Sequence, residues 1–82
     1  MSKALIISKE NCGYCTRVRH VLNMKAVEFE EQKYECDLTL EQIEEKVRQY
    51  IGENRLTFPQ VFIDGEYIGG YTDVCKKYGI NA

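Results

Sequence analysis

Cys12 and Cys15 are separated by two residues. A pair at this spacing can supply half of a zinc or iron–sulfur site, or it can act as a dithiol that forms and breaks a disulfide. Structural zinc usually needs four ligands, and the other thiols and the only histidine are scattered along the chain at Cys36, Cys75 and His20. A four-ligand site within one chain is therefore disfavoured, and a redox-active dithiol is the better interpretation.

A buried strand and an amphipathic helix flank this cysteine pair. The apolar run at residues 4–7 predicts a strand over residues 3–8, and apolar side chains at steps of three and four predict a helix over residues 13–25. The apolar face of this helix continues to Phe29. Cys12 therefore lies at a helix N-terminus, whose unpaired amides carry about half a positive charge and favour the reactive thiolate. Lys9 adds a formal positive charge nearby.

The rest of the chain predicts two more helices and three more strands. A short strand is expected at residues 33–37, with Cys36 as a small buried side chain on it. Thr39 and Gln42 form a capping-box signature for a helix that Gly52 ends. The only proline, Pro59, opens a strand-like run, because proline suits the start of a strand.

A hairpin and a final helix complete the predicted architecture. Asp64-Gly65 is a two-residue hairpin signal, and Thr72-Asp73 opens a short helix that Gly79 ends. The resulting order is βαβαββα. A crossover helix makes the first two strands parallel, and the hairpin makes the last two antiparallel. The expected fold class is α/β, with a mixed four-stranded sheet and helices on both faces.

Composition limits the classes of partner. The 82 residues suffice for one domain, residues 1–82, and the formal net charge is -2. No basic run is present to bind nucleic acid, and no apolar stretch approaches the length of a membrane span. No export signal begins the chain, so the cysteines are expected to work in a reducing cytoplasm rather than as a secreted disulfide framework.

Four motifs, taken together, resemble those of the glutaredoxins. They are a lysine three residues before the first cysteine, the stretch at residues 12–15, Thr57-Phe58-Pro59, and the stretch Gly-Gly-Tyr-Thr-Asp at residues 69–73. The resemblance covers nearly the whole chain. It implies a thioredoxin fold and a glutathione-dependent thiol–disulfide oxidoreductase that reduces protein disulfides and glutathione mixed disulfides. Glutathione would be the reductant, with no tightly bound cofactor.

The resemblance also assigns roles to individual residues. Cys12 matches the attacking cysteine and Cys15 the resolving one, and the bond before Pro59 is expected to be cis. The positions expected to bind glutathione are Lys9, Tyr14, Arg48, Thr57, Phe58, Pro59, Thr72 and Asp73. Cys75 is expected to be a half-buried bystander. The implied clients are disulfide-containing or glutathionylated proteins, among them ribonucleotide reductase, and the protein is expected to be a monomer.

The sequence departs from the family pattern at two positions, and one of them leaves another function open. Gly13 stands where proline is usual, and similar sites without that proline occur in relatives that bind a [2Fe–2S] cluster between two subunits. Cys12 and glutathione would then be cluster ligands in an iron–sulfur carrier or sensor. Phe58 stands where valine is usual, which matters little for a backbone contact. A third hypothesis is a thioredoxin-like donor reduced by a flavoprotein reductase.

Overall fold

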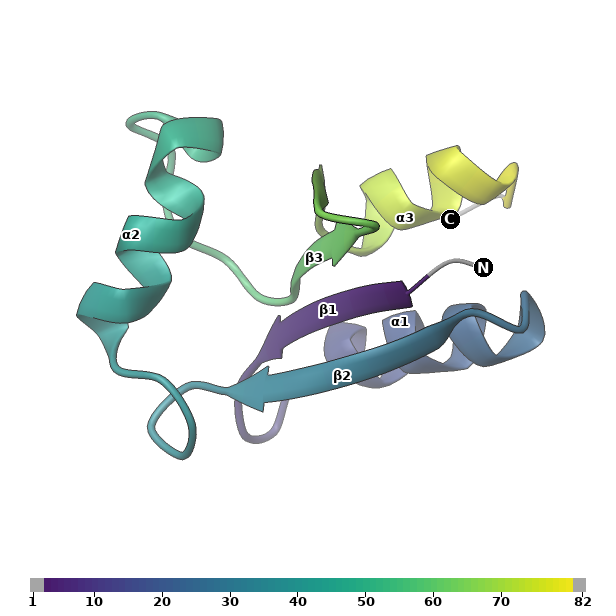
Figure 1. Ribbon diagram of the computed structural model, residues 1–82, viewed down its shortest axis with the longest axis horizontal. Helices are drawn as coiled ribbons and strands as arrows, with labels where there is room; N and C mark the ends of the chain where they lie inside the picture. The colour runs from purple at the N-terminus through teal and green to yellow at the C-terminus, as the bar shows by residue number, and fades with distance from the viewer. Residues whose placement is uncertain (1–2, 81–82) are drawn as a thin grey trace.

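The computed structural model describes residues 3–80 and contains a four-stranded mixed sheet with three helices (Figure 1). The elements, in chain order, are β1 (Lys3–Ser8), α1 (Gly13–Met24), β2 (Glu28–Lys33), α2 (Leu40–Ile51), β3 (Gln60–Ile63), β4 (Glu66–Gly69) and α3 (Tyr71–Tyr78). The strand order is β2-β1-β3-β4. β1 is parallel to β2 and antiparallel to β3, and β3 pairs antiparallel with β4. The predicted order βαβαββα and the thioredoxin-like α/β architecture are confirmed.

Helices cover both faces of the sheet because alternate residues of β1 point in opposite directions. Ile6 belongs to one apolar cluster, together with Val18 of α1 and Val74 of α3. Ile7 belongs to a second cluster, together with Ile43 of α2. All five of these side chains are fully buried. Figure 1 shows α1 passing behind β1 and β2, with α2 set apart at the left.

The second strand lies earlier in the chain than its prediction at residues 33–37. β2 spans Glu28–Lys33 and runs in parallel register with β1, with Phe29 opposite Ala4. The helix before it ends at Met24, and the chain reverses at Ala26, which has a left-handed φ of 55°. Phe29 therefore packs against the core from a strand rather than from an extension of α1.

Most of the segment predicted as a strand, residues 35–37, is a turn. Glu35 adopts a left-handed φ of 72°, and Asp37 Oδ2 accepts a hydrogen bond from the backbone N–H of Lys33 at 3.0 Å. Cys36 lies in this turn and is exposed, so its prediction as a buried side chain is wrong. Cys75 is 1% exposed on α3 and is fully buried rather than half-buried.

The predicted ends of α2 and the predicted C-terminal end of α3 agree with the structure. Thr39 Oγ1 accepts from Gln42 N at 3.2 Å, and Gln42 Oε1 accepts from Thr39 N at 2.9 Å, which completes the capping box of α2. Gly52 follows the end of α2, and Gly79, with a left-handed φ of 70°, ends α3. None of the helices in residues 3–80 has the length and apolar character that crossing a membrane requires.

Candidate functional site: a dithiol beside a polar groove

Cys12 caps the N-terminus of α1, and its sulfur is bonded to that of Cys15. The backbone N–H of Cys15 donates to Cys12 Sγ at 3.3 Å, and the two Cα atoms are 5.3 Å apart. Such an amide favours a thiolate on Cys12 once the disulfide is reduced. Cys15 is 1% exposed, whereas Cys12 is only partly buried. Cys12 is therefore the sulfur that an incoming thiol or disulfide can reach.

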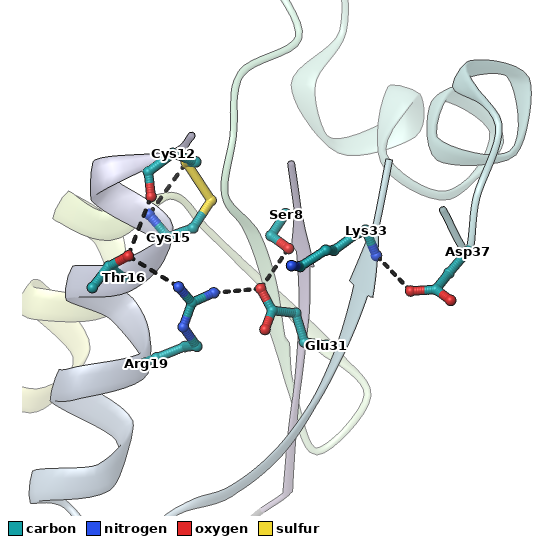
Figure 2. Close-up of polar contacts among 8 residues, drawn as sticks. All are labelled: Ser8, Cys12, Cys15, Thr16, Arg19, Glu31, Lys33 and Asp37. Atoms are coloured by element: carbon teal, nitrogen blue, oxygen red, sulfur yellow. Dashed lines mark hydrogen bonds and ion pairs between the residues drawn. A yellow bond between two sulfur atoms is a disulfide. The ribbon is translucent and has the colours of Figure 1, made fainter. Parts of the chain in front are cut away.

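A polar network joins the two ends of the loop that carries Cys12 (Figure 2). Ser8, the last residue of β1, donates to Glu31 Oε2 at 2.6 Å, and Arg19 of α1 forms an ion pair with the same oxygen. Arg19 Nη2 also donates to Thr16 Oγ1 at 2.9 Å, and Thr16 Oγ1 donates to the Cys12 carbonyl at 3.5 Å. Ser8 is fully buried. The network ties the strand before the loop to the helix after it.

A groove of about 600 Å³ opens next to this loop, and Tyr14, between the two cysteines, lines it. Six of the eight residues predicted to bind glutathione lie in its wall: Tyr14, Thr57, Phe58, Pro59, Thr72 and Asp73. The Phe58–Pro59 bond is cis, as predicted. The groove therefore gathers residues from α1, from the segment before β3 and from the start of α3.

Asp73 is held at the groove by the two glycines before α3. Its Oδ2 accepts from the backbone N–H of Gly70 at 3.2 Å. Gly69 has a φ of 122°, and a Cβ there would overlap the Asp73 carboxylate. A Cβ at Gly70 would lie 3.6 Å from the carbonyl oxygen of Pro59. Gly69 thus lets the chain pass close to Asp73, whereas a side chain at Gly70 would make only an ordinary contact with Pro59.

Lys9 and Arg48, the two cations among the predicted residues, are not part of the groove wall. Lys9 Nζ lies 5.6 Å from the centroid of the Phe58 ring. Arg48 Nη1 donates to the carbonyls of Gly52 at 2.7 Å and Asn54 at 2.9 Å, so Arg48 holds the loop that follows α2. A contact between Arg48 and a glutathione carboxylate stays a prediction.

Sequence reasoning missed several groove residues, of which Arg55 and Tyr71 carry obvious chemistry. Arg55 brings a cation to the groove from an exposed loop without a recognisable motif. Tyr71 lies 5.7 Å from Tyr14 between ring centroids, and the Arg17 guanidinium lies over both rings, at 5.9 Å and 5.3 Å. A side-chain hydrogen bond with Cys75 is the main cause that raises the pKa of Tyr71.

The described residues offer no feature that favours the iron–sulfur alternative. Across residues 3–80, no group of three or more His, Cys, Asp or Glu side chains comes together in a way that could hold a metal ion. Cys36 is exposed in its turn and Cys75 is buried on α3, so neither joins Cys12 and Cys15. The dithiol itself is the reactive feature of this site.

Comparison with known proteins agrees with this chemistry. The glutaredoxin family model matches residues 4–68. The chain is 36% identical to glutaredoxin 3 of Escherichia coli over 74 residues, which cover 90% of this chain and 83% of that protein. A buckwheat glutaredoxin–glutathione complex superposes with a TM-score of 0.69 at 31% identity, covering 95% of this chain and 69% of the other. A glutaredoxin from Brucella melitensis superposes with a TM-score of 0.71 at 32% identity, covering 94% and 80%.

The family model spans most of the chain, and the superposed relatives share its fold. The more accessible member of a disulfide-capable pair at a helix N-terminus is the reactive group that thiol–disulfide exchange needs. The chain therefore belongs to the glutaredoxin family and is a thiol–disulfide oxidoreductase whose redox-active pair is Cys12 and Cys15.

Proposed function

We propose that the groove beside Cys12 binds glutathione and that the enzyme transfers glutathione and disulfides through Cys12. The observation that carries this proposal is the convergence of Tyr14, the Thr57–Pro59 segment and Asp73 on one groove. Glutaredoxins use glutathione as their reductant, and one structural relative is a glutathione complex. A groove of about 600 Å³ is of the size that holds small-molecule ligands.

The charges around the groove are complementary to those of glutathione, which carries two carboxylates and one ammonium. We assign the ammonium to Asp73, the only carboxylate in the described groove wall. Arg55 in the wall, with Lys9 and Arg48 nearby, offers cations for the carboxylates. The backbone of Thr57 and Phe58, ahead of Pro59, is assigned to the cysteinyl part. Thr72 is assigned to the γ-glutamyl end together with Asp73.

The exchange steps follow from the positions of the two sulfurs. The Cys12 thiolate attacks the glutathione sulfur of a mixed disulfide, forms a bond to it and releases the client as a thiolate, which takes up a proton. A second glutathione thiolate then attacks this new bond, producing oxidised glutathione and restoring the Cys12 thiolate. When the substrate is a protein disulfide, Cys15 displaces the client from Cys12, and the Cys12–Cys15 disulfide remains to be reduced.

We further propose the setting in which the enzyme works. Residues 1–82 would act as one domain and as a monomer in the cytoplasm, where glutathione keeps thiols reduced. Ribonucleotide reductase is our first candidate among the client proteins, because it is a typical client of the family that the sequence motifs resemble. Sedimentation of the purified protein would test the monomer, and a direct reduction assay would test the client.

Turnover of a small glutathione mixed disulfide should require Cys12 but not Cys15. We expect Cys12→Ser to abolish turnover of a small glutathione mixed disulfide in an assay coupled to glutathione reductase. Cys15→Ser should retain it, because removal of glutathione from a small substrate needs only the attacking thiol. Loss of turnover in both variants would contradict the proposal that Cys12 alone removes glutathione from a small substrate.

The same assay separates this function from the thioredoxin-like alternative. Replacing glutathione and glutathione reductase by a flavoprotein thioredoxin reductase should leave the enzyme nearly inactive. If the flavoprotein supported turnover and glutathione did not, the groove would have to serve another purpose.

A further inference from the structure

Gln60 is a buried polar side chain directly after the cis proline. It is 2% exposed, and its Nε2 donates to the Thr57 carbonyl at 2.8 Å and lies 3.4 Å from Thr57 Oγ1. Its Oε1 accepts a hydrogen bond from the Tyr67 hydroxyl at 2.6 Å. Because the Thr57 carbonyl can only accept, the amide must face it with its nitrogen, and Tyr67 must then be the donor to the oxygen.

Tyr67 is in turn oriented by two aromatic neighbours. Its ring is stacked on that of Tyr50 of α2, at 4.6 Å between centroids and an interplanar angle of 4°. It meets the Phe62 ring edge-on at 5.4 Å. These contacts restrict the ring and so determine where the hydroxyl points. Both Tyr67 and Tyr50 line the groove.

These contacts form a continuous chain from α2 to the segment that precedes Pro59. Tyr67 directs the Gln60 amide, and the amide holds Thr57. We propose that Tyr67 and Gln60 are positioning residues that hold Thr57 in the conformation needed to bind the glutathione moiety of the substrate. This inference rests on the proposed function of the groove, and it gives these two side chains a role in substrate affinity that does not involve the reacting sulfurs.

Tyr67→Phe is the sharpest test, since it removes only the hydroxyl and keeps the aromatic stacking. The Gln60 oxygen would then be buried without its donor, and the amide would no longer be held in one orientation. We expect KM for a glutathione mixed disulfide to rise about fivefold, with kcat little changed. Tyr78→Phe, at the far end of α3, is the matched control and should leave both constants unchanged.

A second variant links the effect to Gln60. Gln60→Met keeps the length of the side chain and removes the donor to Thr57. If the two residues act through one chain, the double variant should raise KM no more than the larger single effect, because coupled residues are not additive. The alkylation rate of Cys12 against pH should match the wild type in every variant, since neither residue touches the sulfurs.

The outcomes separate the inference from the function on which it rests. If wild-type turnover saturates with the glutathione substrate and Tyr67→Phe has the wild-type KM, the positioning role is overturned and the glutathione groove stands. If Tyr67→Phe lowers the apparent kcat for every substrate in proportion to its loss of folded protein and leaves KM unchanged, the hydroxyl acts through stability and the inference is also overturned. A wild-type enzyme without saturable dependence on glutathione would overturn both.

Discussion

Asp73 has a structural role in α3 and a proposed role in binding glutathione. One oxygen accepts the Gly70 N–H and so caps the first turn of α3, where the helix dipole favours a negative charge. The side chain also lines the groove, where we assign it to the glutathione ammonium. Substitutions that keep one task and remove the other can therefore measure each separately.

Asp73→Asn should weaken recognition of glutathione while it keeps an oxygen that can cap α3. A charge-assisted hydrogen bond contributes about 1.5–3 kcal/mol when well formed, and the exposure of Asp73 reduces this value. We expect about a tenfold rise in KM for glutathione, equivalent to about 1.4 kcal/mol. Asp73→Ala should show the same rise and should also lower the free energy of unfolding, because it removes the cap.

Reduction of the Cys12–Cys15 disulfide by a small dithiol is the control for this prediction. A dithiol without an ammonium group should reduce the wild type and both variants at equal rates. Equal losses with the dithiol and with glutathione would show that Asp73 acts through folding. Unchanged kinetics with both reductants would make Asp73 an ordinary solvated charge with a capping role.

The roles of single residues were predictable where a motif carried them. The spacing of Cys12 and Cys15 and the run of residues before Cys12 identify the dithiol without any structure. Gln60 and Tyr67 could not be paired in the same way, because they meet across a hairpin with an irregular register between Val61 and Phe62. The partners of Arg48 depend on the path of an irregular loop, which no sequence periodicity describes.

At the scale of elements, two predictions are wrong for the same physical reason: the extension of the first helix to Phe29 and the placement of the second strand at residues 33–37. The chain turns at Ala26 and at Glu35, both of which have left-handed φ angles that usually favour glycine or asparagine. Without a glycine there, the apolar spacing predicts that α1 continues to Phe29 and that the second strand starts later than it does. The capping box at Thr39 and the hairpin at Asp64-Gly65 were predicted correctly because their turn residues are the usual ones.

The tight connection between β4 and α3 leads to an element-scale prediction. Gly69→Ala would place a methyl group on the Asp73 carboxylate and force alanine into a φ of 122°. We expect the free energy of unfolding to fall by about 1–3 kcal/mol, as judged by urea denaturation. The displaced Asp73 should also raise KM for glutathione.

Gly13→Ala is the matched control for this change. A Cβ at Gly13 would meet no atom within 4 Å, and its backbone is helical. Alanine should therefore be tolerated or slightly stabilising there. If Gly69→Ala proved as stable as Gly13→Ala, the close approach between β4 and Asp73 would not be a constraint on the fold.

At the scale of the whole molecule, the sequence predicted the architecture because several local signals agreed. The apolar residues of β1 point to both faces, and each helix carries one apolar stripe that can cover a face. Short connections and the handedness of the crossover leave few ways to arrange four strands and three helices. The full wall of the groove could not be predicted from these local signals, because it is assembled from segments far apart in the chain.

Tyrosine ionisation should make the stability of the folded protein fall at alkaline pH. Burial is the main cause that raises the pKa of Tyr67 and Tyr78 above the ordinary value of 10.0, and the carboxylates of Asp73 and Asp64 add to it. Above that value the unfolded chain loses these protons before the folded protein does, so the free energy of unfolding decreases as pH rises.

Urea unfolding measured between about pH 8 and about pH 11 would check this dependence. The double variant Tyr67→Phe/Tyr78→Phe should show a flatter profile than the wild type above about pH 10. A profile as steep as that of the wild type would assign the alkaline loss to other groups.

The strand order makes β2 an edge strand of the sheet. One side of β2 pairs with β1, and within residues 3–80 the backbone groups on its other side have no partner strand in the sheet. An open border of this kind is a template on which another chain can add a strand and start aggregation. β2 carries three carboxylates, at Glu28, Glu30 and Glu31, within its six residues. Two copies that met along this border in parallel register would bring like charges together, which opposes pairing. We therefore expect the acidic residues of β2 to oppose association of two copies along this border.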